Sequence, residues 1–235
     1  MNDPVVGATA RSLLEDAKTL LDRIVRDKRL EARAAFGFWP ANAVDETIEV
    51  YPDVERSTVL DVLVMPRQLM DKRGTGRPNY CLADFVAPRD SGIIDYVGAF
   101  AVTAGHGAGV LAAEFEAQLD DYGSIMAKAL ADRLAEAFAE RLHERVRREF
   151  WGYASNEVLE NADLIKERYQ GIRPAPGYPA CPDHSAKRSL FALTEATSRA
   201  AMQLTESFAM IPGASVSGWY FWRPESRYFG VGTTA

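Results

Sequence analysis

The 235-residue sequence contains little cysteine, little histidine and no long uncharged hydrophobic run. Two cysteines, Cys81 and Cys181, are too few for a disulfide framework or for a zinc site made of cysteine alone. The most apolar stretch, residues 93–113, includes Asp95 and His106, and a lipid-facing helix would have to bury Asp95. The start of the chain lacks the basic-then-apolar order of a secretory signal peptide. These absences favour a cytoplasmic protein without a membrane span or a metal site.

Positive charge is also scarce, because 27 Lys and Arg stand against 33 Asp and Glu, a formal net charge of −6. A protein that binds the nucleic-acid backbone needs clustered Lys and Arg, so nucleic acid is not an expected partner. The 47% of hydrophobic and 26% of charged residues are typical of a globular protein and exclude wholesale disorder. A single domain over residues 1–235 is the most economical interpretation.

The hydrophobic pattern predicts a mixture of helices and strands, and therefore an α+β fold. Helical periodicity covers residues 5–30, 156–168 and 185–202. Pro40 is excluded from a helix interior and ends the first helical region. Strand-like segments occupy residues 47–51, 57–65, 96–102, 204–210, 217–222 and 227–231.

The strongest periodic signal lies in the middle of the chain. From Tyr122 to Phe150 an apolar residue recurs at every fourth position. Each four-residue step advances about 400° around a helix, so the stripe drifts by about 40° per step and winds around it. We therefore expect one long central helix over residues 110–150, bent near Gly123, with several elements packed around it.

Two short motifs each have a functional and a structural interpretation. Residues 105–109, GHGAG, look like a dinucleotide-binding loop, but the short helix and second strand of that motif do not follow, which favours a tight turn. Cys181 and His184 would be a nucleophilic pair only with an orienting third group and an oxyanion hole. A small buried cysteine beside a surface histidine is the default interpretation of that pair.

Residues 173–184 are unusual because they contain four prolines. Proline fixes its own φ and pushes the preceding residue towards an extended conformation, which predicts a stiff segment with many unpaired carbonyls. Arg173 offers a planar cationic fork that suits a carboxylate, and Tyr178 offers an aromatic face with a polar tip. On these residues alone, a ligand-binding segment and a purely structural crossing both remain open.

The segment 169–184, YQGIRPAPGYPACPDH, closely resembles the signature of the C-terminal activation domain of cobalamin-dependent methionine synthase. The similarity extends through residues 79–88, 128–146 and 204–220, and it covers the chain from about residue 5 to 231. The resemblance implies a single C-shaped α+β domain, with long central helices bounded by a twisted antiparallel sheet.

The resemblance also implies a function in methionine biosynthesis. Domains of this family bind S-adenosylmethionine, whose methyl group restores methylcobalamin from inactive cob(II)alamin during reductive reactivation. Cobalamin is carried by a separate module, and a flavodoxin-type protein supplies the electron. The chain would then be one module of a methyltransferase that transfers methyl from 5-methyltetrahydrofolate to homocysteine, and would not perform that reaction alone.

The family's ligand-binding positions fall on residues of this sequence, and no catalytic residue is implied. Arg173 would pair with the methionyl carboxylate, the Ala175 backbone would face the adenine, and Tyr178 would line the ligand. Glu136 would hold the amine or the ribose, and Tyr228 with Phe229 would close the pocket. The methyl group must remain uncovered for its acceptor, so we expect a shallow groove rather than a closed pocket.

The sequence also departs from the family pattern. It starts after a family segment with an Ile-Asp-Trp motif whose Asp contacts the ligand, and it ends before the family's usual C-terminal tail. Loss of one charged contact would lower affinity by roughly 10- to 100-fold. This departure leaves a second hypothesis, a non-catalytic interaction module that keeps the fold and docks a cobalamin-domain partner without useful ligand binding.

Overall fold

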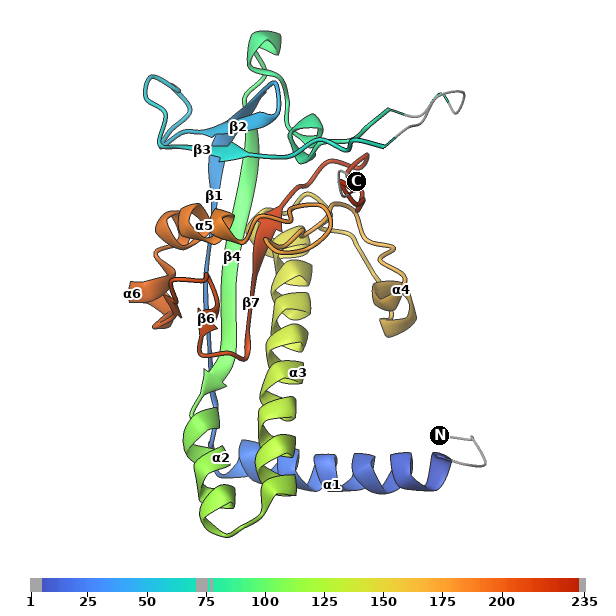
Figure 1. Cartoon of the computed structure of the whole chain (residues 1–235). Helices are drawn as coiled ribbons and strands as arrows, with labels where there is room; N and C mark the ends of the chain where they lie inside the picture. Colours follow the sequence, from blue (N-terminus) through green and yellow to red (C-terminus); the bar gives the residue numbers. More distant parts are fainter. Residues whose placement is uncertain (1–5, 71–75, 77, 233–235) are drawn as a thin grey trace.

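The computed structural model describes residues 6–70, 76 and 78–232, and a five-stranded antiparallel sheet lies at its centre (Figure 1). The strand order is β3-β2-β1-β4-β7. These strands are β1 (Glu31–Val44), β2 (Thr47–Val50), β3 (Asp61–Val64), β4 (Asp95–His106) and β7 (Ser215–Tyr220). A separate two-residue pair is formed by β5 (Gln203–Leu204) and β6 (Met210–Ile211). The long β1–β4 pair forms the middle of the sheet.

The described residues also form six α-helices. They are α1 (Gly7–Arg26), α2 (Ala108–Ala117), α3 (Asp121–Arg145), α4 (Asn161–Ile165), α5 (Lys187–Thr194) and α6 (Ala196–Ala200). A π-helical turn, Val146–Phe150, continues α3. None of these helices has both the length and the hydrophobicity that crossing a bilayer requires.

Successive residues of each strand point to opposite faces of the sheet, and this alternation divides the core in two. Phe100 of β4 and Tyr220 of β7 point to the face covered by α3, where they pack with Leu142. Ala99 of β4 and Trp219 of β7 point to the other face, which α5 and α6 cover. The sheet is therefore buried on both sides.

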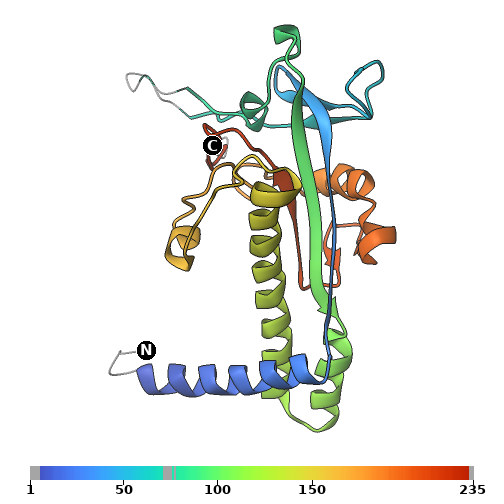
Figure 2. The same cartoon turned by 180° about the vertical axis from the view of Figure 1, so that it is seen from behind.

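The outline of the molecule is open and C-shaped, as the resemblance implied. The long β1–β4 pair and α3 run side by side as a spine in both views (Figures 1 and 2). The segment that follows β3 leaves the spine at one end, and α1 leaves it at the other, towards the same side. At the base, Leu20 and Ile24 of α1 pack against Met126 of α3. The expected α+β fold is confirmed.

The predicted single central helix is wrong, because the chain reverses between α2 and α3. Leu119 adopts a positive φ of 57°, and the Asp120 side chain accepts a hydrogen bond of 2.8 Å from the Gly123 N–H and caps α3. A Cβ at Gly123 would lie 2.4 Å from the ring of Phe115, so the hairpin is tightly packed. The pattern of an apolar residue at every fourth position therefore lies in α3 and its π-helical turn alone.

The sequence analysis missed β1, the longest strand, because it contains Pro40. The carbonyl of Pro40 accepts a hydrogen bond of 2.9 Å from Tyr51 N, at the point where β2 has ended. A strand residue's N and O point to the same side, so the missing N–H faces the end of β2 rather than the continuous pairing with β4. Proline is therefore tolerated in a central strand here.

Several shorter elements differ from the prediction, while the β2–β3 hairpin was predicted correctly. The expected helix over 156–168 is reduced to α4, and that over 185–202 divides at Glu195, whose φ is 53°. The strand expected over residues 204–210 is replaced by the two-residue strands β5 and β6 at its ends, and residues 227–231 form no strand. The GHGAG motif is the tight turn between β4 and α2, since Gly107 has a φ of 91° and a Cβ there would meet the Arg29 carbonyl.

Candidate functional site

A cavity of about 510 Å³ opens between α3, the proline-rich segment and the end of the chain. We call residues 173–180 the ribbon. The cavity's wall contains all six residues that the sequence predicted: Glu136, Arg173, Ala175, Tyr178, Tyr228 and Phe229. Its volume lies within the roughly 300–1,000 Å³ that is usual for small-molecule sites.

The ribbon is held in place by the strand edge of β7. Ile172 and Phe221 exchange two main-chain hydrogen bonds of 2.9 and 3.0 Å, and Trp219 N donates to the Pro174 carbonyl at 2.9 Å. The chain therefore enters the ribbon as a short extra strand beside β7. This pairing fixes where Arg173 leaves the backbone.

Four of the eight carbonyls of residues 173–180 accept main-chain hydrogen bonds, so the expectation of many unpaired carbonyls holds only in part. Val231 N donates to the Pro179 carbonyl at 2.9 Å, and Tyr178 N donates to the Ala175 carbonyl at 3.2 Å. Prolines remove donors from the ribbon, but neighbouring segments supply them. The Ala175 N–H, by contrast, has no hydrogen-bond partner among the described residues and lies at the wall of the cavity.

A tight turn follows at Gly177. Its φ is 96°, and a Cβ at this position would lie 2.2 Å from Cε1 of the His184 ring. Gly177 N donates to the Cys181 carbonyl at 2.7 Å, which closes the turn. Glycine is therefore required both by the backbone conformation and by the close ring.

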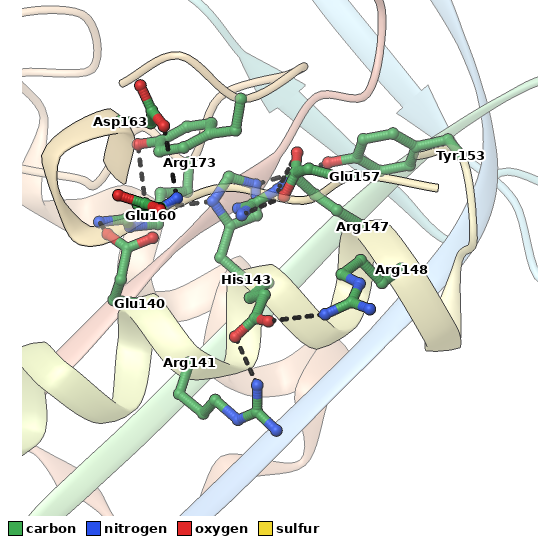
Figure 3. A network of polar contacts seen from close by, with 12 residues as sticks. Glu140, Arg141, His143, Arg147, Arg148, Tyr153, Glu157, Glu160, Asp163 and Arg173 are labelled. Atoms are coloured by element: carbon green, nitrogen blue, oxygen red, sulfur yellow. Dashed lines mark hydrogen bonds and ion pairs between the residues drawn. The ribbon is translucent and has the colours of Figure 1, made fainter. Parts of the chain in front are cut away.

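Arg173 is anchored by side chains of α3 and of the segment before the ribbon (Figure 3). Its Nη2 donates to Glu140 Oε2 at 2.7 Å, and its Nη1 donates to His143 Nδ1 at 3.1 Å and to the Tyr169 hydroxyl at 3.1 Å. Burial, followed by the charges of Arg147 and Arg173, lowers the pKa of His143 well below its usual value. The imidazole is therefore neutral at physiological pH.

Two carboxylates give the cavity a negative character. Glu136 on α3 and Glu167 after α4 are exposed, and neither forms a hydrogen bond or ion pair within the described part of the chain. The opposing charge of Arg173 is already shared with Glu140. A ligand that carries positive charge in addition to a carboxylate fits this distribution.

The C-terminal strap, residues 222–229, is fastened to the start of β4. The buried carboxylate of Asp95 accepts hydrogen bonds from Trp222 Nε1 at 2.7 Å and from Arg223 Nε at 2.9 Å. It also accepts from Ala87 N at 2.8 Å. Asp95 is thus a buried charge with a complete set of partners, which explains an acid within the most apolar stretch.

The strap brings two aromatic side chains to the cavity. Phe229 packs against Tyr80 and Phe85, with ring centroids 5.9 and 6.2 Å away. The hydroxyl of Tyr228 accepts a hydrogen bond of 3.0 Å from the main-chain N–H of Arg173. The strap and the ribbon therefore form one connected wall.

Comparison with known families gives a match over residues 1–235 to the model described as vitamin B12 dependent methionine synthase, activation domain. The chain belongs to this family. A solved structure, the crystal structure of the MetH reactivation domain bound to AdoHcy, matches this activation domain with a TM-score of 0.94 and 58% sequence identity. The match covers 97% of this chain and 70% of that chain. The resemblance seen in the sequence is therefore correct.

The hypothesis of a Cys181–His184 nucleophile does not fit this activation domain. Cys181 is buried, and burial, with a contribution from Asp183, raises the pKa of its thiol to about 11. His184 Nδ1 lies 2.8 Å from Nζ of Lys187 rather than against the sulfur. A thiol that stays protonated at neutral pH is not an activated nucleophile. Across the described residues, no group of three His, Cys, Asp or Glu is arranged to hold a metal ion.

Sequence reasoning missed three polar residues of this activation domain's site: Glu140, His143 and Glu167. Glu140 and His143 lie four and seven residues after Glu136, which places all three on one face of α3. That spacing was a usable signal, because residues four and seven apart share a helix face. Glu167 carried no comparable signal, since it follows a short helix and reaches the cavity only through the fold.

Proposed function

We propose that this activation domain binds S-adenosylmethionine in the cavity and presents its methyl group to cobalamin on a separate module of methionine synthase. One observation carries the proposal: six candidate residues from separate parts of the sequence line the wall of one cavity. The bound AdoHcy of the 58% identical MetH reactivation domain supports it, since AdoHcy is the product left when S-adenosylmethionine loses its methyl group.

The charges of the wall suit the proposed ligand. S-adenosylmethionine carries a carboxylate, an ammonium group and a sulfonium centre. Arg173 would take the carboxylate, while Glu136 and Glu167 would attract the two cationic centres. The Ala175 N–H, without a partner among the described residues, would donate to the adenine, and Tyr178 would cover the ligand's apolar surface.

The exposed position of Tyr178 suits transfer to an external acceptor. Its side chain lies at the cavity wall, and the residue is 63% exposed. Cobalamin on its own module would supply the methyl acceptor, and a flavodoxin-type reductant would supply the electron that the acceptor needs. S-adenosylhomocysteine would be the product left in the cavity. The ribbon would hold the nucleoside and leave the methyl group open to this partner.

The same proposal extends to the setting of the chain. We propose that residues 1–235 act as one unit in the cytoplasm, where Cys81 and Cys181 remain the free thiols that the structure shows. The methyl transfer from 5-methyltetrahydrofolate to homocysteine needs sites for folate, homocysteine and cobalamin. The residues argued above form one nucleoside-sized site, so this reaction requires the other modules.

Calorimetry with S-adenosylmethionine tests the proposal on wild type, Arg173→Ala and Arg141→Ala. Arg141 is the matched control, because it pairs with Glu144 on the solvent side of α3. We expect Arg173→Ala to weaken binding by about tenfold or more, and Arg141→Ala to bind as wild type. Absence of heat from the wild type at millimolar ligand would overturn the proposal.

A second measurement separates the proposal from the docking-only hypothesis. The chain is mixed with a cobalamin-bearing module of methionine synthase, a flavodoxin-type reductant and S-adenosylmethionine, and the cobalamin absorbance is followed. Conversion of cob(II)alamin to methylcobalamin that depends on this chain supports reactivation. Stable association with the module without ligand binding or conversion supports docking alone.

A further inference from the structure

We propose that His143, together with Tyr169 and Glu140, is a positioning residue that holds the Arg173 guanidinium in the orientation needed to bind the ligand carboxylate. The inference rests on the proposed function and assigns a role to a histidine that lies behind the cavity wall. Figure 3 shows His143 on α3 with its ring directed at Arg173.

The hydrogen bonds of Arg173 leave a defined pair of donors. A guanidinium has five N–H groups. Both N–H groups of Nη1 are used by His143 and Tyr169, and one of Nη2 is used by Glu140. The N–H of Nε and the second N–H of Nη2 have no partner among the described residues, and the residue lines the cavity. A bidentate carboxylate takes one donor from each of two guanidinium nitrogens, which Nε and Nη2 can supply.

His143 fits this role because it can act only as an acceptor towards Arg173. Arginine has no acceptor atom, so the 3.1 Å contact requires a lone pair on Nδ1 and places the proton of the neutral ring on Nε2. Nε2 lies 3.4 Å from the Tyr153 hydroxyl, towards which that proton points. The histidine is therefore held in one tautomer.

The ring is also held in one orientation. It stacks on Tyr220 with centroids 5.2 Å apart and planes 17° apart, and it meets Tyr169 edge-on at 5.0 Å. The His143 residue is fully buried. An arginine side chain loses rotamer entropy when it is fixed, and a rigid partner removes that loss from the binding step.

The test compares two ligands with two variants of His143. The ligands are S-adenosylmethionine and its decarboxylated analogue, which lacks the group that Arg173 is proposed to bind. The variants are His143→Asn, whose amide oxygen can take the place of Nδ1, and His143→Leu, which has nearly the same shape as Asn and no acceptor. Calorimetry gives the four dissociation constants, with wild type as reference.

We expect His143→Leu to weaken the binding of S-adenosylmethionine by about tenfold and to leave the binding of the decarboxylated analogue unchanged. His143→Asn should bind both within about twofold of wild type. Equal weakening of both ligands in His143→Leu would show a purely structural role and overturn the inference. Failure of the wild type to bind S-adenosylmethionine would instead overturn the proposed function, and this inference with it.

Two measurements keep the inference testable if His143→Leu does not fold. Tyr169→Phe removes one hydroxyl from the groups that hold Arg173. We expect it to weaken the binding of S-adenosylmethionine by about threefold without affecting the binding of the decarboxylated analogue. Nitrogen NMR of histidine-labelled wild type reports the tautomer directly. A protonated Nδ1 on His143 would contradict the acceptor role irrespective of any ligand.

Discussion

The hydroxyl of Tyr228 lies 3.0 Å from the main-chain nitrogen of Arg173 and accepts its hydrogen bond. This bond joins two segments that are 55 residues apart in the chain. The C-terminal strap and the ribbon therefore hold each other, and the Arg173 backbone is fixed from the cavity side while its side chain is fixed from α3.

The Tyr228–Arg173 bond predicts the effect of Tyr228→Phe. Loss of one hydrogen bond, worth about 1 kcal/mol, should loosen the strap and lower the affinity for S-adenosylmethionine by roughly fivefold in calorimetry. Tyr122→Phe is the matched control, because its hydroxyl bonds Asp16 on the exposed surface between α1 and α3. Equal affinities in the two variants would show that the strap does not shape the site.

The turn at Gly177 predicts a strong effect of a single methyl group. Gly177→Ala meets the His184 ring and forces a non-glycine residue to a φ of 96°, so we expect a stability loss of about 1–3 kcal/mol in urea unfolding and weaker ligand binding. Gly213→Ala is the control, since its Cβ meets nothing within 4 Å and its φ is not positive. The double variant with His184→Ala should recover part of the loss. No recovery would assign the whole effect to the backbone.

The partners of Asp95 predict a large stability effect of a residue that does not line the cavity. Asp95→Ala leaves the Trp222 and Ala87 donors without their acceptor and removes the partner of Arg223, so the free energy of unfolding should fall by about 3 kcal/mol. Asp61→Ala, at the half-buried start of β3, removes only a local bond from the Val62 N–H and should change it by about 1 kcal/mol or less. Urea unfolding measures both. A similar small effect in both variants would contradict the anchoring role of Asp95.

Burial of His143 predicts how stability depends on pH. Its pKa in the native protein lies well below 6.5, whereas the unfolded chain takes up the proton near pH 6.5. The unfolded state therefore binds more protons as the pH falls below 6.5, and the free energy of unfolding should drop by up to about 1.4 kcal/mol per pH unit. Above pH 6.5 this contribution is fully present.

The measurement for this prediction is urea unfolding of wild type and His143→Asn between pH 5 and 8. The groups that face His143 are Arg147, Arg173, Tyr153, Tyr169 and Tyr220. Burial raises the pKa of the three tyrosines, so these stay neutral across that range. We expect the pH slope below 6.5 to be shallower in the variant. Identical slopes would show that His143 is not its source.

Local signals explain which parts of the fold were predicted. The helical stripe predicted α1, and alternation with a turn predicted the β2–β3 hairpin. The same reasoning failed at β1, because the penalty for Pro40 depends on which neighbour its missing N–H would face. It failed again at Leu119, where one residue of positive φ divides a continuous apolar pattern into a helical hairpin.

The site, like the fold, was predicted where local sequence signals sufficed and missed where distant residues had to be paired. The ribbon was visible in the sequence, and the family resemblance supplied six candidate residues, three of them in the ribbon. Their ligand contacts stay predictions until binding is measured. Glu140 and His143 were visible on one face of α3, but nothing in the sequence paired them with Arg173. The roles of Asp95 and Glu167 were invisible for the same reason.

The sequence by itself determined much of the ribbon's backbone, since prolines restrict φ and Gly177 permits the positive φ of the turn whatever surrounds them. It also determined the amphipathic faces, because helical and strand periods place side chains without reference to other segments. Only the tertiary structure decided the cavity, the charge state of His143 and the anchoring of Arg173 to a residue 30 positions away. Burial and charge pairing depend on which distant groups share a space, and that is a property of the folded chain.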